Sequence, residues 1–289
     1  MGSKDKEFCT EYTGFEMMLV SACRQIKNED IVFNAFHWPF LAVHMAKLLH
    51  CPDLFSVLEV GLFQDELSKP IKMPYSISDP VLVPNSLFVG DSIDALSILQ
   101  RGEITIALLS TSMVDKYGNC NTTVVGSYEE PIYRLPGGGG ATEIAGMAKR
   151  LIWLIDDHTK RRLPEKLDFI TDPGYLEGFD SRIKAGYPSD TGPDTIVSPF
   201  CTMKFDSESK EAYVDALHPN ITIEQIKENT GWDINIADRV KQIDPPTMTE
   251  IDVCRKTMQD AIDQYFVLKP EWTTYLDPPS RPPGPREEI

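Results

Sequence analysis

The chain has 289 residues, of which 42% are hydrophobic, so it is long enough to bury one sizeable core and has the composition of an ordinary folded protein. Its formal net charge of -16 argues against nucleic acids and anionic membrane surfaces as partners, because affinity for both depends mainly on Lys and Arg. Any anionic ligand must therefore be bound by a local site, since the overall field of the protein repels it.

The cysteines and the start of the chain indicate the compartment. The six cysteines are scattered and form no CxxC pair, which is typical of a reducing environment rather than of a secreted disulfide scaffold. Residues 1–7 are polar and no signal-peptide core follows them. No stretch approaches the roughly 20 apolar residues that span a bilayer. We therefore expect a soluble cytoplasmic protein.

The first third of the chain alternates patterns of helix and strand. Apolar residues from Phe15 to Ile26 recur at helical spacing. The short apolar run 31–33 predicts a buried strand, Pro39 can open a second helix, and 54–58 predicts a second buried strand. Such an alternation normally builds two parallel strands joined by a right-handed crossover.

The alternation continues to about residue 171. Strands are predicted at 87–89, 104–109, 151–155 and 169–171, and helices at 91–100 and 141–150. Repeated βα units indicate an α/β fold with a mainly parallel sheet and flanking helices. In such sheets the ligand crevice lies beyond the carboxyl ends of the strands.

Beyond residue 180 turn residues become frequent. Short strands are predicted at 195–197, 201–205 and 212–214, then a helix opened by the capping-box pair Thr222 and Gln225, and a last helix at about 248–265. The proline-rich end cannot form helix or central strand. We therefore expect a single α/β domain over residues 1–269 and an extended or disordered tail over residues 270–289.

Glu59 directly follows the predicted strand 54–58. Its carboxylate is expected at the carboxyl end of a core strand, facing the crevice. An ionised carboxylate in this place can attack an activated acyl group and divide one difficult step into two easier ones. A solvated acid at a strand end is the alternative interpretation, and the residue alone does not decide between them.

Four consecutive glycines, Gly137, Gly138, Gly139 and Gly140, precede the helix predicted at 141–150. They allow the backbone to approach a ligand closely and to adopt positive φ. Their amides, next to a helix N-terminus, can hold an oxyanion or another anionic group. A flexible surface loop is the alternative.

Two other motifs also follow strand ends. The segment 115–121 (DKYGNCN) is typical of a tight structural turn. The basic run 158–162 can bind a ligand phosphate, although such runs are more often solvated turns. The five histidines are dispersed, and no metal-ligand spacing, serine elbow or dinucleotide-binding glycine motif occurs. We therefore expect no metal and no permanently bound cofactor.

In their order along the chain, these motifs resemble the class I coenzyme A transferases, and in particular the β-type subunits of glutaconate CoA-transferase-like enzymes. The resemblance runs from about Glu16 to Val267. It is carried by MLVSACRQIK at 18–27, VLEVGL at 57–62, VDKYGNCN at 114–121 and LPGGGGA at 135–141, with HTKRR at 158–162, DFITDPG at 168–174 and NTGWD at 229–233 in support.

This resemblance implies a class I CoA-transferase-like fold and the movement of CoA between an acyl-CoA and a small carboxylic acid. It implies that Glu59 is the catalytic nucleophile and that the reaction passes through a glutamyl-CoA thioester. It also implies that backbone amides of Gly137 to Gly140 hold the oxyanions of the tetrahedral intermediates. The coenzyme A thioester is then a substrate. The resemblance also implies an α-type partner subunit, without which the chain is inactive, in an α2β2 or larger hetero-oligomer.

Three segments depart from the family pattern. NAFHW at 34–38 replaces an early glycine-rich turn, Gly138 replaces a serine, and the run ending at Met113 replaces Gly-Gly-Ala-Gln. The candidates for a reshaped pocket are Asn34, His37, Met113 and Asn119. Two alternatives to transfer stay open: an acyl-CoA hydrolase, ring-opening hydrolase or decarboxylase on the same scaffold, and a non-catalytic binding subunit.

Overall fold

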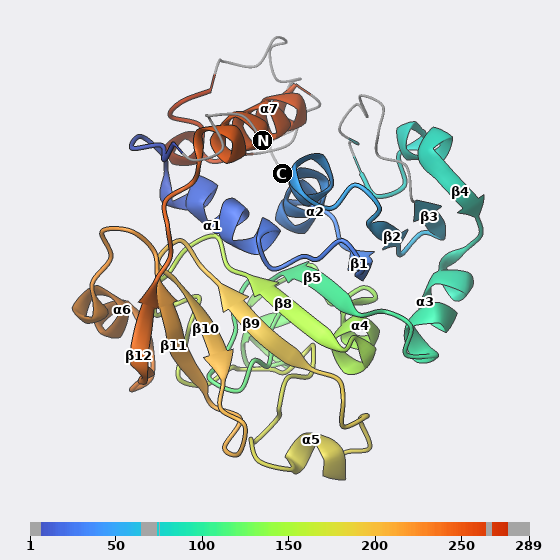
Figure 1. Ribbon diagram of the computed structural model, residues 1–289. Helices are drawn as coiled ribbons and strands as arrows, with labels where there is room; N and C mark the ends of the chain where they lie inside the picture. Colours follow the sequence, from blue (N-terminus) through green and yellow to red (C-terminus); the bar gives the residue numbers. More distant parts are fainter. Residues whose placement is uncertain (1–6, 65–73, 75, 264–267, 277–289) are drawn as a thin grey trace.

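The computed structural model describes residues 7–64, 74, 76–263 and 268–276, so the first six residues, the end of the helix predicted to 265, and residues 277–289 of the tail lie outside the described part. Within it, ten strands form one sheet (Figure 1). Its five central strands are parallel, as predicted; in spatial order they are β9 (Pro193–Val197), β8 (Arg150–Leu154), β5 (Ile106–Ser110), β1 (Ile31–Asn34) and β2 (Phe55–Leu58).

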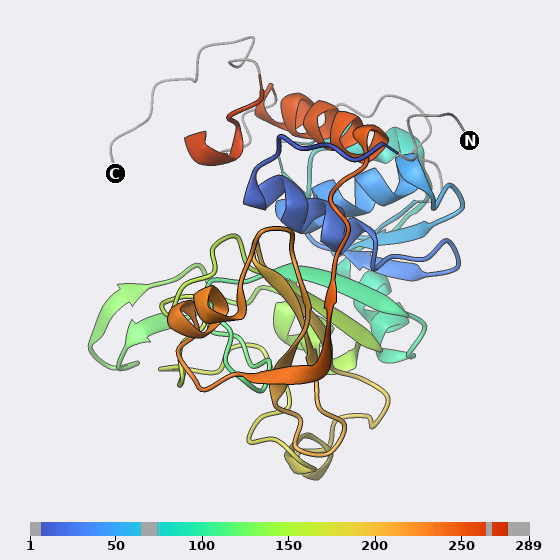
Figure 2. The same ribbon diagram turned by 60° about the vertical axis from the view of Figure 1, so that its left-hand side comes forward.

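The sheet is extended on both sides by strands that are partly antiparallel. On one side β2 is followed by β3 (Leu62–Gln64) and β4 (Ser86–Val89), both antiparallel. On the other side β9 is followed by β10 (Cys201–Phe205), β11 (Ala212–Leu217) and β12 (Asn235–Gln242), of which only the last pair is parallel. A separate hairpin of β6 (Val124–Gly126) and β7 (Pro131–Arg134) stands away from the sheet, in light green in Figure 2.

Helices cover both faces of the sheet (Figure 1). On one face α1 (Gly14–Cys23), α2 (Trp38–Leu49) and α7 (Met248–Ile262) pack against one another; on the other lie α3 (Ser92–Gln100) and α4 (Ala141–Met147). The short helices are α5 (Ser181–Lys184), α6 (Ile223–Asn229) and the 3-10 helices η2 (Pro80–Asn85) and η3 (Pro270–Trp272). Thr222 and Gln225 form the predicted capping box of α6.

The central strands feed two cores. Leu58 and Leu154 pack in the core beneath α1, α2 and α7, whereas Val57 and Trp153 pack in the core beneath α3 and α4. Strands that are covered on both faces are apolar on both sides. This is why the central strands appear in the sequence as continuous apolar runs.

Two predicted segments are different in the structure. Residues 169–171 form no strand, and Phe169 and Ile170 lie on the surface. Residues 270–276 are not an extended tail: η3 brings Trp272 into the core, where its ring stacks on Phe15 with 4.1 Å between centroids. The free energy of burying the indole offsets the cost of ordering this segment, and the packed part of the chain extends beyond residue 269.

Candidate functional site

Glu59 lies at the carboxyl end of β2, in the tight turn that leads into β3. The turn closes through a hydrogen bond from the Gly61 amide to the Leu58 carbonyl, 2.9 Å long. Gly61 has φ +91°, and any side chain there would meet the backbone of Asp91 at 2.5 Å. Glycine is therefore required at position 61, two residues after Glu59, and the turn is held against the junction of β4 and α3 by a hydrogen bond from the Gly90 amide to the Gly61 carbonyl.

The Glu59 carboxylate lies directly against Gly140, the N-cap residue of α4. A Cβ added to Gly140 would lie 2.6 Å from Oε1 and 2.8 Å from Cδ of Glu59. Within the described residues the Glu59 carboxylate forms no ion pair and accepts no hydrogen bond from another side chain. The two motifs that the sequence singled out thus meet in space, and the carboxylate is half-buried but unpaired.

The glycine loop presents backbone amides next to this carboxylate. Gly137 and Gly139 adopt positive φ, +94° and +55°, which glycine adopts without strain. The Gly137 amide donates to the Thr122 carbonyl at 2.7 Å, whereas the amides of residues 138–140 have no acceptor among the described residues. Free amides beside a carboxylate can hold an oxyanion that develops there.

A buried layer supports the loop from behind. Asp172 accepts a hydrogen bond from the Thr142 hydroxyl at 3.1 Å, and burial raises the pKa of Asp172 to about 6. The space beside Gly138 is filled by the same two residues and Thr171, at 3.0 to 3.1 Å from an added Cβ, so the loop is packed and not loose.

Arg182 holds the other end of α4. Its buried guanidinium donates to the carbonyls of Ala145 and Gly146 at the end of the helix, and to those of Pro173 and Gly174 next to Asp172. Sequence reasoning missed this residue, because SRIK at 181–184 carries no motif.

The four candidate pocket residues lie in different surroundings. Asn34 is opposite Leu58 in the β1–β2 register, one residue from Glu59, and its buried Oδ1 has no partner among the described residues. His37 is an exposed residue with φ +65° at the start of α2. Met113 lines a pocket of about 360 Å³.

Asn119, by contrast, uses its whole side-chain amide in hydrogen bonds within the chain. It is fully buried, its amide nitrogen donates to Asp115 and to the Leu176 carbonyl, and its oxygen accepts from the amides of Gly174 and Leu176. The side chain holds the turn 115–121 to the segment after Asp172. The alternative interpretation of this motif, a structural turn, therefore fits.

Comparison with known proteins decides the family. A family model described as coenzyme A transferase matches residues 17–229, which is more than half of the chain. The chain belongs to the coenzyme A transferase family. This confirms the resemblance noted in the sequence, and with it the CoA-transferase class of enzyme.

Two curated relatives and several solved structures agree. The chain is 39% identical over 245 residues to the B subunit of 3-oxoadipate CoA-transferase from Pseudomonas knackmussii, covering 84% of the chain and 92% of the relative. It is 32% identical over 268 residues to the B subunit of glutaconate CoA-transferase from Acidaminococcus fermentans, covering 90% and 97%. The crystal structure of glutaconate coenzyme A-transferase from that organism matches with a TM-score of 0.79 at 30% identity, over 87% of this chain and 96% of that one. The decarboxylase AibA/AibB matches with a TM-score of 0.71 at 20% identity, over 85% and 94%, a likeness of fold.

The basic run of this CoA transferase chain separates into residues with different environments. His158 is buried between Ser198 and Thr230, and burial lowers its pKa to about 3. Arg162 pairs with Asp156 at 3.0 Å. Lys160 and Arg161 are exposed, and Arg161 lines the same pocket as Met113. The interpretation as a solvated turn therefore fails for the two ends of the run.

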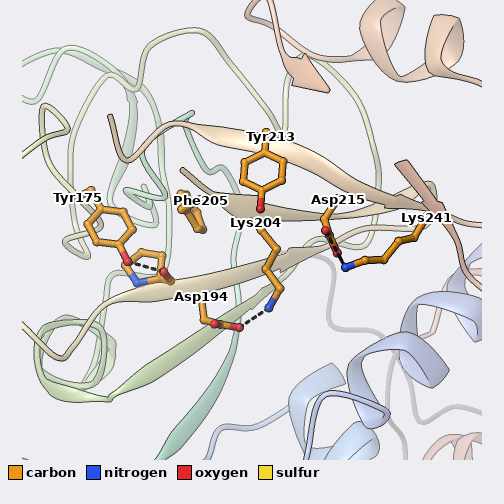
Figure 3. Close-up of a pocket in the computed structure, with 8 residues that line it drawn as sticks. Tyr175, Asp194, Lys204, Phe205, Tyr213, Asp215 and Lys241 are labelled. Atoms are coloured by element: carbon orange, nitrogen blue, oxygen red, sulfur yellow. Dashed lines mark hydrogen bonds and ion pairs between the residues drawn. The ribbon is translucent and has the colours of Figure 1, made fainter. Parts of the chain in front are cut away.

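Another pocket of the transferase chain, of about 400 Å³, lies on the outer strands β9–β12 (Figure 3). Its charges are compensated within the chain: Lys204 pairs with Asp194 at 2.7 Å and Lys241 with Asp215 at 3.1 Å. It contains none of the predicted site residues. In the described residues no group of His, Cys, Asp and Glu is placed to hold a metal ion, and no helix is long and apolar enough to cross a bilayer.

Proposed function

We propose that the chain is the β-type subunit of a heteromeric cytoplasmic enzyme that transfers CoA between an acyl-CoA and a small carboxylic acid, with Glu59 as the nucleophile. The observation that carries this proposal is the contact between the unpaired Glu59 carboxylate and Gly140, beside the free amides of the glycine loop. Nucleophile and oxyanion donors thus come from two distant parts of the chain.

In the first half-reaction, a carboxylate oxygen of Glu59 attacks the thioester carbonyl carbon, the carbon–sulfur bond breaks and the CoA thiolate leaves. This gives a mixed anhydride of Glu59 and the acyl group. The thiolate then attacks the Glu59 carbonyl carbon and expels the acid as a carboxylate. The product is a glutamyl-CoA thioester, and no net proton is taken up or released.

The second half-reaction reverses these steps with a different acid. The acceptor carboxylate attacks the carbonyl carbon of the glutamyl thioester and expels the CoA thiolate, which gives a mixed anhydride of Glu59 and the acceptor. The thiolate then attacks the acceptor carbonyl carbon and releases the Glu59 carboxylate. Amides of residues 138–140 hold the oxyanion of each tetrahedral intermediate, a contribution of about 3 kcal/mol per donor in comparable sites. Asn34, one residue away on the neighbouring strand, is a candidate for orienting the acid.

An α-type subunit is the proposed partner, in an α2β2 or larger assembly. Both curated relatives are named as B subunits, and such a name implies an A-type counterpart. Glu59 is only half-buried in the single chain, so a partner can complete the walls around it. The acids in the names of the relatives, 3-oxoadipate and glutaconate, are the first ones to test.

Trapping the intermediate tests this function. The chain is co-purified with its α-type partner, incubated with an acyl-CoA and treated with borohydride, which reduces a thioester but not a free carboxylate. Reduction at Glu59, lost in the Glu59→Gln variant, is the expected result. Turnover to a free acid with no adduct and no need for an acceptor would instead show the second candidate, hydrolysis, which the bulky segment 34–38 beside the site favours. Absence of any CoA binding would leave a non-catalytic role.

A further inference from the structure

A buried carboxylic acid, Asp172, lies against the glycine loop. We propose that Asp172 is a positioning residue of the transfer reaction, whose ionised carboxylate fixes the glycine loop in its active position through Thr142 and Gly138. The proposal rests on the proposed function, since it assumes that amides of this loop hold the oxyanions. It adds a residue that does not contact the reacting atoms but changes the rate through its charge.

Asp172 and Thr142 together enclose Gly138. A Cβ added to Gly138 would lie 3.1 Å from Oδ1 of Asp172 and 3.0 Å from Oγ1 of Thr142, which is closer than an ordinary contact. Two residues further along the loop, a Cβ on Gly140 would lie 2.6 Å from Oε1 of Glu59. The loop contacts the buried pair through Gly138 and the reacting carboxylate through Gly140. A change in the pair therefore moves the loop amides relative to Glu59.

The Thr142 hydroxyl has one proton and two acceptors within reach. Its Oγ1 lies 3.1 Å from Oδ1 of Asp172 and 3.1 Å from the carbonyl oxygen of Thr171. An ionised carboxylate is the stronger acceptor, so the hydroxyl bonds to Asp172 when that group is charged. When Asp172 is protonated its Oδ1 is a weaker acceptor, and the Thr171 carbonyl competes for the same proton. The charge of Asp172 therefore controls how the first turn of α4 is held.

Burial brings the change of charge into a pH range that can be assayed. Asp172 is fully buried, and its Oδ2 has no hydrogen-bond partner among the described residues. Removing a carboxylate from water favours its neutral form. This burial raises the pKa of Asp172 to about 6. The acid is therefore mostly ionised at pH 8 and mostly neutral at pH 5.

The charged and titratable groups around Asp172 do not compensate its charge. The Cys120 thiol faces it and stays neutral, because burial raises the pKa of that thiol well above its usual range. Glu143, in the first turn of α4, is a second negative charge and adds to the effect of burial on the pKa of Asp172. Arg182 donates to the carbonyls of residues 173–174, and within the described residues Asp172 has no ion-pair partner. Titration of Asp172 thus changes the net charge next to the loop.

The test measures kcat/KM of the co-purified complex between pH 5 and 8. Asp172→Asn keeps the shape of the side chain and imitates the neutral acid. A hydrogen bond to a charged acceptor is roughly twice as strong as a neutral one. We therefore expect the wild type to exceed Asp172→Asn about fivefold at pH 8 and less than about twofold at pH 5. The ratio cancels the titration of Glu59 and of the substrates, which are the same for both proteins.

Two other variants complete the test. Thr142→Val removes the hydroxyl that joins Asp172 to α4, so at pH 8 it should lose as much activity as Asp172→Asn, and the double variant should lose no more than either. Asp194→Asn is the matched control, because it neutralises a half-buried carboxylate that pairs with Lys204 on the outer strands. It should leave the pH profile of kcat/KM unchanged.

A ratio of wild type to Asp172→Asn that stays constant from pH 5 to 8 would overturn the proposal and leave the residue a structural role only. Losses of Asp172→Asn and Thr142→Val that multiply in the double variant would also overturn it, and so would an altered pH profile in Asp194→Asn. Continued trapping of the Glu59 thioester in these cases would show that the transferase function stands. Absence of the thioester in the wild type would instead refute the proposed function itself.

Discussion

Replacing Gly140 with alanine tests the contact between the glycine loop and Glu59. Gly140 has φ -84° and ψ 2°, which alanine can adopt, so the substitution does not strain the backbone. The new Cβ would lie 2.6 Å from Oε1 and 2.8 Å from Cδ of Glu59, whereas ordinary contacts begin at 3.4 Å. The carboxylate must therefore move by about 0.6 to 0.8 Å to restore ordinary contact distances.

This displacement affects stability and activity differently. The atoms that must move are the end of a flexible side chain, and alanine at an N-cap costs about 1 kcal/mol or less relative to glycine. A reacting group misplaced by about 1 Å can lose about 100-fold in rate, which corresponds to about 2.7 kcal/mol of activation free energy. We therefore expect kcat/KM of the Gly140→Ala complex to fall by about 100-fold while the protein stays folded.

The assay measures kcat/KM for CoA transfer and the midpoint of urea unfolding. Gly102→Ala is the matched control: Gly102 has φ +73° and open space around it, at the end of α3. This variant should lose about 1–2 kcal/mol of stability through left-handed strain and keep its kcat/KM. Gly140→Ala with kcat/KM within twofold of the wild type would refute the placement of Glu59.

Three further predictions concern stability. Burial lowers the pKa of His158 to about 3 and that of His218 to about 4, while an unfolded histidine titrates near 6.5. Below about pH 6.5 the unfolded chain binds more protons than the folded chain, so the stabilisation is complete above that pH and is lost as the pH falls. The loss is at most about 1.4 kcal/mol per pH unit for each histidine, until the pKa of the folded state is reached. The urea midpoint should therefore fall as the pH is lowered from 7 to 5, and it should fall less steeply in the His158→Gln variant. Arg182→Met leaves four carbonyls without their donor and should cost about 3 kcal/mol in urea unfolding, and an unchanged midpoint would contradict the anchoring of α4. Trp272→Ala removes the stack on Phe15 and should lower the unfolding free energy by about 3 kcal/mol, an effect that a disordered tail would not show.

The sequence predicted the parts of the fold whose physical signal is local. The central strands are apolar because both of their faces are covered, and α6 begins where a capping box requires it. The strand β12 (NIADRVKQ) escaped prediction because it lies at the edge of the sheet, where polar residues are tolerated on both faces. The apolar pair Phe169 and Ile170 suggested a strand, yet both lie on the surface and Phe169 stacks on Tyr128.

The candidate site was predictable residue by residue but not as an arrangement. Glu59 and the glycine loop carry recognisable motifs, whereas their contact depends on the spatial order of β2, β1, β5 and β8. The role of Asn119 also escaped prediction, because three of its side-chain hydrogen bonds join backbone groups more than fifty residues away, which cannot be seen in a turn motif. Trp272 has no periodic pattern around it, and its burial is explained only by its distant partners Phe15 and Trp38.

The most direct test of the account follows one oxygen atom. In the proposed reaction the acceptor carboxylate leaves one of its oxygens on Glu59 in every turnover, because the thiolate attacks the acceptor carbonyl and the bridging oxygen stays with the enzyme. Mass spectrometry of the Glu59 peptide after turnover with an oxygen-18-labelled acceptor acid should therefore show the label in the Glu59 carboxyl group. Sustained CoA transfer with no label at Glu59 would contradict the account.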